Sequence, residues 1–177
     1  MIFSINIFKK NKINYDWKTL YVGFNLGLIK NSDITNYAVD FLGSHSESDN
    51  QNIVELAWGG NDIDYERLLR NILRESNVDD LVPDSDVWQL ETRKWRFGIL
   101  TDLEIMYQND PEELLNKIAE VYADFDYPED MDSFINYLTP KAGYDPSLYS
   151  PKENVARLMN YFNVFLNKEQ QYLQKIA

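Results

Sequence analysis

Residues 110–124 read DPEELLNKIAEVYAD and combine several signals of an α-helix. Asp110 is a residue type that caps helix N-termini, and Pro111 suits the first helical turn. The two glutamates that follow face the positive end of the helix dipole. Leu114 and Ile118, four residues apart, then begin an apolar stripe. The stretch therefore predicts an amphipathic α-helix.

Similar signals recur on both sides of this helix. Ser32 and the pair Ser150–Pro151 are typical helix starts, whereas Gly59–Gly60 is typical of a helix end. One further helix is expected to be capped by Asn61 or Asp62. The helices predicted on this basis cover residues 16–29, 32–43, 53–58, 62–73, 86–107, 111–122, 127–138 and 151–176. Seven or eight amphipathic helices make an all-α fold the prediction.

The chain shows no sign of division into domains. It has 177 residues, without an internal repeat, a low-complexity tract or a linker rich in Pro, Gly and Ser. We therefore expect one domain over residues 1–177. Residues 1–13 are ambiguous: their isoleucines and phenylalanines can form a short N-terminal strand, but no clear partner strand follows.

Composition narrows the classes of partner. Cysteine is absent, which excludes disulfides, thiolate metal sites and cysteine nucleophiles. The net charge of −12 repels DNA, RNA and anionic lipid head groups, so direct nucleic-acid binding is disfavoured and basic proteins are favoured. The sequence shows neither a signal peptide nor an apolar run of the ~20 residues that span a bilayer. We expect a soluble cytoplasmic protein that makes no membrane contact.

Negative charge is concentrated in one part of the chain. Residues 101–132 contain eleven Asp or Glu and one Lys, whereas residues 1–30 contain five Lys and one acid. Within residues 124–132, acids alternate with aromatic side chains, a combination that suits a basic protein partner. The residues predicted to bind that partner are Asp124, Asp126, Tyr127, Glu129, Asp130 and Asp132. The competing interpretation is that the aromatics hold a helix–turn–helix corner together while the acids cap it.

No catalytic constellation is evident. His45 is the only histidine and lies in a polar segment, far from any nucleophile motif. The acids of residues 124–132 are suitable oxygen ligands for Ca²⁺ or Mg²⁺, but their spacing does not match an EF-hand. We therefore expect no catalytic residues, metal ion or cofactor. An enzyme that uses paired carboxylates, with or without a hard cation, is one alternative. A structural assembly module that joins a larger complex through its helices is another.

Trp95, between Lys94 and Arg96, has two interpretations. The flanking cations would allow a cation–π binding spot. However, Trp95 falls at helical spacing with Trp88 and Ile99, which predicts a position in the core.

Several segments together resemble a known family. The most specific is residues 121–131, VYADFDYPEDM, continued by Phe134 and Tyr137. The other segments are Tyr15–Trp17 with Gly23, Asp33–Ala38, Glu55–Ala57 and Lys94–Arg96 with Leu100. They resemble a bacterial family catalogued as a domain of unknown function (number 2247), and the resemblance covers about residues 15–166. It implies a small bacterial cytoplasmic protein with no assigned catalytic residues.

The resemblance also implies a class of function. Acidic families of this kind often act as immunity proteins in contact-dependent growth inhibition and other polymorphic toxin systems. Many of the toxins are nucleases, whose active-site faces are basic because they bind phosphates. An acidic inhibitor is steered toward such a face. The expected function is therefore an immunity-type inhibitor that neutralises a cognate, nuclease-like toxin domain.

Overall fold

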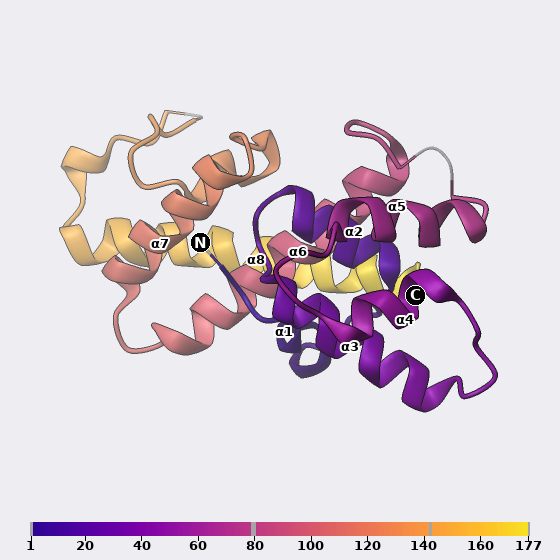
Figure 1. Cartoon of the computed structure of the whole chain (residues 1–177). Helices are drawn as coiled ribbons and strands as arrows, with labels where there is room; N and C mark the ends of the chain where they lie inside the picture. The colour runs from indigo at the N-terminus through magenta and orange to yellow at the C-terminus, as the bar shows by residue number, and fades with distance from the viewer. Residues whose placement is uncertain (1, 79–80, 142, 177) are drawn as a thin grey trace. The chain divides into compact units, whose positions relative to one another are not determined.

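The computed structural model describes residues 2–78, 81–141 and 143–176 (Figure 1). Over these residues the protein is all-α, as predicted, and contains no strand. The α-helices are α1 (Asn6–Lys10), α2 (Trp17–Asn25), α3 (Asn31–Ser44), α4 (Gln51–Trp58), α5 (Tyr65–Glu75), α6 (Asp86–Met106), α7 (Pro111–Asp124) and α8 (Pro151–Lys175). Two 3₁₀ helices, η1 (Glu129–Phe134) and η2 (Pro146–Leu148), lie between α7 and α8 in the sequence.

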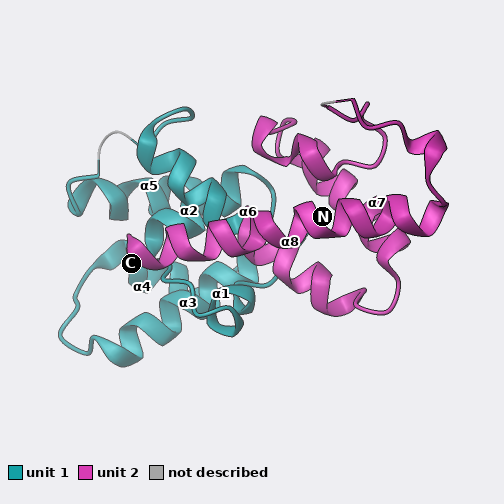
Figure 2. Cartoon of the chain, turned by 180° about the vertical axis from the view of Figure 1, so that it is seen from behind, with its two compact units in different colours: residues 1–95 teal, residues 96–177 magenta. Residues whose placement is uncertain are grey.

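The chain divides into two compact units, residues 1–95 and residues 96–177, coloured separately in Figure 2. We call them unit 1 and unit 2. The boundary falls inside α6. The expectation of a single domain over residues 1–177 stays a prediction.

Trp95 is the largest fully buried side chain of unit 1, which confirms its predicted place in the core. Its indole Nε1 donates a hydrogen bond to the backbone oxygen of Thr19 at 2.8 Å. The ring meets Phe8 edge-on, with the centroids 4.6 Å apart. Its other close neighbour is Gly23, where a β-carbon would overlap the indole ring. The glycine in the middle of α2 is therefore explained by the close approach of a tryptophan.

The alternative of a short N-terminal strand is wrong. Residues 6–10 form α1, and the adjacent side chains of Ile7 and Phe8 are both buried. A strand would direct two neighbouring side chains to opposite faces. A strand would also leave its backbone N–H and C=O groups without a partner strand to bond with. In the helix these groups form hydrogen bonds with nearby residues, for example from the Asn11 N–H to the Ile7 oxygen at 3.1 Å.

Two predicted helix boundaries in unit 1 shift for local reasons. The helix expected over residues 16–29 ends at Asn25, and Gly27 then adopts a φ of +67°. The cap of α5 is Asp64, not Asn61 or Asp62, since the Asp64 carboxylate accepts the Arg67 N–H at 3.0 Å.

Two further elements differ from the prediction. Helix α3 begins at Asn31, one residue before Ser32, because the Asp33 carboxylate accepts the Lys30 N–H at 3.3 Å and takes over the capping role. The helix expected over residues 127–138 is the shorter 3₁₀ helix η1.

Two of the helix starts predicted in unit 2, at Asp110 and at Ser150, are confirmed. The Asp110 carboxylate accepts the Glu113 N–H at 3.1 Å at the start of α7. At the start of α8, Ser150 and Glu153 form a reciprocal capping box. The core of unit 2 contains a cluster of aromatic side chains. The ring of Phe134 in η1 lies 5.5 Å from that of Phe162 and 5.1 Å from that of Phe165, both in α8.

Candidate partner-binding surface

Residues 124–132 form the end of α7, a sharp turn and the start of η1. Backbone hydrogen bonds close the helix: the Tyr127 N–H donates to the Tyr122 oxygen at 2.9 Å, and the Asp126 N–H donates to the Ala123 oxygen at 3.2 Å. This pair of bonds is a Schellman cap, which requires a left-handed residue after the helix. Asp126, with a φ of 60°, supplies it, and Tyr127 has a φ of 56°.

The side chains of the cap reinforce the backbone pattern. The rings of Tyr122 and Tyr127 meet edge-on with their centroids 5.3 Å apart. A contact between these two positions commonly accompanies a Schellman cap. The turn is thus fixed by its own residues, which directs the segment away from the axis of α7.

Five of the six predicted binding residues are exposed to solvent: Asp124, Asp126, Tyr127, Glu129 and Asp130. We call the first four of them the acidic corner. The Tyr127 side chain is notable because 56% of a large aromatic residue is exposed.

Asp130 is committed to an interaction inside unit 2. Its two oxygens accept hydrogen bonds from the two terminal nitrogens of Arg96, at 2.9 and 2.5 Å. The Arg96 side chain is buried, and its guanidinium lies 5.4 Å from the centre of the Phe165 ring. Asp130 therefore neutralises a buried cation and holds η1 to the part of α6 that belongs to unit 2.

Asp132 is also engaged, and it is partly buried. The Tyr122 hydroxyl donates to one of its oxygens at 2.8 Å, and the Lys141 ammonium donates to the other at 3.0 Å. The hydrogen bonds from Lys141 and Tyr122 lower the pKa of the Asp132 carboxyl. The hydrogen bond between Tyr122 and Asp132, together with desolvation, raises the pKa of the Tyr122 hydroxyl to about 12. This cluster ties α7, η1 and the following loop together.

The two interpretations of the acidic run thus apply to different residues. Tyr122, Asp130 and Asp132 stabilise the turn through contacts within unit 2, whereas the four residues of the acidic corner are the exposed ones to which the binding interpretation applies. Whether the exposed residues bind a partner stays a prediction.

His45, a candidate named from the sequence, and Glu91, which the sequence did not single out, both have partners inside unit 1. His45 lies at the C-terminal end of α3, where its ring stacks on Phe41 with the centroids 4.2 Å apart. In unit 1 the carboxylate of Glu91 is fully buried and accepts hydrogen bonds from Thr19 at 2.6 Å and Lys94 at 2.9 Å. Among the residues that the structure describes, no three His, Cys, Asp or Glu are placed to hold a metal ion.

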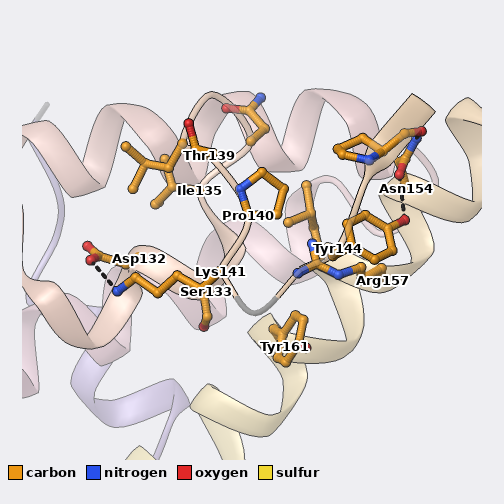
Figure 3. A pocket seen from close by; sticks show the side chains of 14 residues that line it. Asp132, Ser133, Ile135, Thr139, Pro140, Lys141, Tyr144, Asn154, Arg157 and Tyr161 are labelled. Carbon is orange, nitrogen blue, oxygen red and sulfur yellow. Dashed lines mark hydrogen bonds and ion pairs between the residues drawn. The ribbon is translucent and has the colours of Figure 1, made fainter. Parts of the chain in front are cut away.

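One feature of unit 2 was not predicted from the sequence. A hollow opens between the segment after η1 and helix α8, and Arg157, Tyr144 and Lys141 contribute to its lining (Figure 3). The spacing of Arg157 and Tyr161, one helical turn apart, is the only local signal of it. The contribution of Tyr144 depends on a loop whose path the sequence pattern does not determine.

The fold and this surface define an acidic all-α protein. Residues 5–170 match the model of a family described as an uncharacterized protein conserved in bacteria (DUF2247), so the chain belongs to that family and the resemblance is confirmed. Searches of curated proteins and of solved structures gave no match. Within the described ranges, no helix is long and apolar enough to cross a membrane.

Proposed function

We propose that the protein is a non-catalytic binding protein, an immunity-type inhibitor that neutralises a cognate toxin domain through the acidic corner. The observation that carries this proposal is the exposed ring of Tyr127 with three exposed carboxylates within three residues of it. Tyrosine is enriched among the residues that dominate binding energy at protein interfaces. Carboxylates around it accelerate encounter with a basic surface.

The structure of the corner also supports tight binding. The Schellman cap and the ion pair between Arg96 and Asp130 hold the turn in one conformation. A segment that is ordered before binding loses less conformational entropy on association. The exposed side chains would therefore already be in their binding positions when a partner arrives.

Charge favours a basic partner. Residues 96–177 contain fourteen Asp or Glu and seven Lys or Arg. Nuclease-like toxins are suitable targets, because their substrate-binding faces are positive. In this proposal the protein acts in the bacterial cytoplasm, where a toxin of that kind would reach nucleic acid.

The first experiment is affinity capture from the bacterium that produces the protein, at low salt and again at higher salt. We expect one basic polypeptide, encoded beside the gene of this protein and captured less well at higher salt. The purified partner should then lose its toxic activity when the protein is added. A captured partner whose activity is unaffected would contradict inhibition.

Matched charge reversals test the surface itself. The double variant Asp126→Lys/Glu129→Lys should slow association with that partner by about tenfold or more at low salt. The control is Glu47→Lys/Asp62→Lys, which changes the net charge equally at exposed sites of unit 1. Equal effects of the two variants would show that only net charge matters and would overturn the assignment to the acidic corner. Asp130 is left unchanged because its reversal would set a cation against Arg96.

A further inference from the structure

The hollow in unit 2 has the size and lining of a small-molecule site. Its volume is about 290 Å³, near the lower end of the range for ligand pockets. Its lining includes three apolar side chains, Ile135 and Leu138 from the segment after η1 and Leu158 from α8. Polar groups from α8 and from the loop after η1 face the same space, so the hollow joins an apolar surface to a small number of charged groups.

Arg157 is the central charged group. Its guanidinium carbon lies 3.9 Å from the centre of the Tyr144 ring and 5.0 Å from that of Tyr161. Stacking on rings uses the flat faces of a guanidinium and leaves the N–H groups at its edge free to donate. In the described part of the chain, no carboxylate forms an ion pair with Arg157.

The aromatic support of Arg157 is itself fixed. The Tyr144 hydroxyl donates to the Asn154 side-chain oxygen at 2.6 Å, as drawn in Figure 3. On its other side the Tyr144 ring stacks on Tyr149, with centroids 4.8 Å apart and planes 11° from parallel. The guanidinium is therefore held in one orientation before any ligand arrives.

The charge of the hollow selects an anion. Lys141 also lines it, and its partner Asp132 is already shared with Tyr122. Lys141 and Asp132 offset one another, so Arg157 leaves the hollow with one positive charge. In a unit whose acids outnumber its cations two to one, this is a local reversal of sign.

We propose that this hollow binds a small organic carboxylate, independently of the acidic corner. The carboxylate accepts two parallel hydrogen bonds from the edge of Arg157, the geometry in which guanidinium and carboxylate pair most strongly. The apolar part of the ligand lies against the apolar lining residues Ile135, Leu138 and Leu158. A free inorganic anion satisfies only the first of these features, which favours an organic acid over phosphate.

Three probes test this proposal on the full-length protein by NMR titration. Benzoate carries both a carboxylate and an apolar ring, benzamide has the same shape without the charge, and inorganic phosphate has charge without the ring. We expect saturable shifts at Tyr144, Arg157 and Tyr161 with benzoate, with a Kd on the order of 1 mM. Benzamide and phosphate should each bind at least about tenfold more weakly.

Variants locate the interaction. Arg157→Gln should weaken benzoate binding by about tenfold or more, and Arg157→Lys should restore only part of the affinity because lysine lacks the two-pronged edge. Lys152→Gln is the control, since Lys152 is an exposed cation of the same helix outside the hollow.

Several outcomes would overturn the proposal. They are equal binding of benzoate and benzamide, equal binding of phosphate, no saturable shift, and benzoate affinity that Arg157→Gln leaves unchanged. The comparison of the three probes needs no variant, so it decides the matter even if Arg157→Gln does not fold.

Discussion

Arg96 and Asp130 form a two-pronged ion pair in which the arginine side chain is 7% exposed and the aspartate 48% exposed. Asp130 lies within the run that resembled a binding surface in the sequence. Its partner is 34 residues away and buried, so its first role is to keep a cation satisfied inside unit 2. The negative charge of Asp130 therefore contributes to the stability of the fold, whether or not it also contributes to binding.

Removing that carboxylate should destabilise the protein. Asp130→Ala leaves the Arg96 guanidinium buried without its anion, a change that costs about 3–5 kcal/mol in a fully buried pair. Because Asp130 is half exposed, solvent screening reduces the expected loss in unfolding free energy to about 2 kcal/mol. Urea denaturation measures it. The neighbouring control Glu129→Gln should stay within about 0.5 kcal/mol of wild type, and equal stability of both variants would contradict the structural role of Asp130.

The cluster around Asp132 should make stability depend on acid pH. Its pKa is lowered in the folded protein, below the ordinary value of 3.8, chiefly by Lys141 and then by Tyr122. A lowered folded pKa contributes stability that is fully present above 3.8 and is lost as the pH falls through the folded value. The gap in unfolding free energy between wild type and Asp132→Asn should therefore be constant near neutrality and shrink below about pH 4. Lys141→Met removes the main cause and should flatten this dependence, and an unchanged slope in that variant would contradict the assignment.

The contact between Gly23 and Trp95 predicts opposite effects for two similar substitutions. Gly23→Ala places a methyl group into the rigid indole ring and should lower the unfolding free energy by about 2 kcal/mol or more. Gly43→Ala, in α3, meets open space and should raise it by about 0.5 kcal/mol through helix propensity. Thermal unfolding followed by circular dichroism compares them. A stabilised Gly23→Ala variant would mean that α2 does not approach Trp95 as described.

The sequence predicted those features that depend on neighbouring residues. The caps at Asp110 and Ser150 were correct because each involves groups within three residues of one another. The buried position of Trp95 followed from helical periodicity alone. The boundary at Asp64 was missed because several adjacent residues are suitable caps, and the choice among them depends on where the helix packs.

Features that depend on distant residues were not predictable. Nothing local shows that Arg96 would select Asp130 from the acids of its unit, or that Tyr144 would stack on Arg157. The acidic run was therefore predicted as one surface, whereas in the structure Asp130 and Asp132 are bound to side chains within unit 2 and stabilise the turn. The hollow was missed for the same reason.

Substitutions of Asp126 test whether stability and partner binding depend on different properties of this residue. It occupies the left-handed position of the Schellman cap with a φ of 60°, which favours glycine. Asp126→Gly should therefore raise the unfolding free energy by about 0.5–1 kcal/mol. Asp126→Asn, which keeps the shape and removes the charge, is the control for the loss of the carboxylate.

Asp126→Gly also lacks one of the exposed acids. Under the proposed function it should therefore bind the basic partner more slowly than wild type, although it is more stable. An Asp126→Gly protein less stable than wild type would show that the side chain, and not the backbone conformation, stabilises the turn. Equal association rates for wild type, Asp126→Gly and Asp126→Asn would remove Asp126 from the binding surface. A lower association rate together with a higher unfolding free energy in Asp126→Gly would show that this carboxylate contributes to partner binding and not to the stability of the fold.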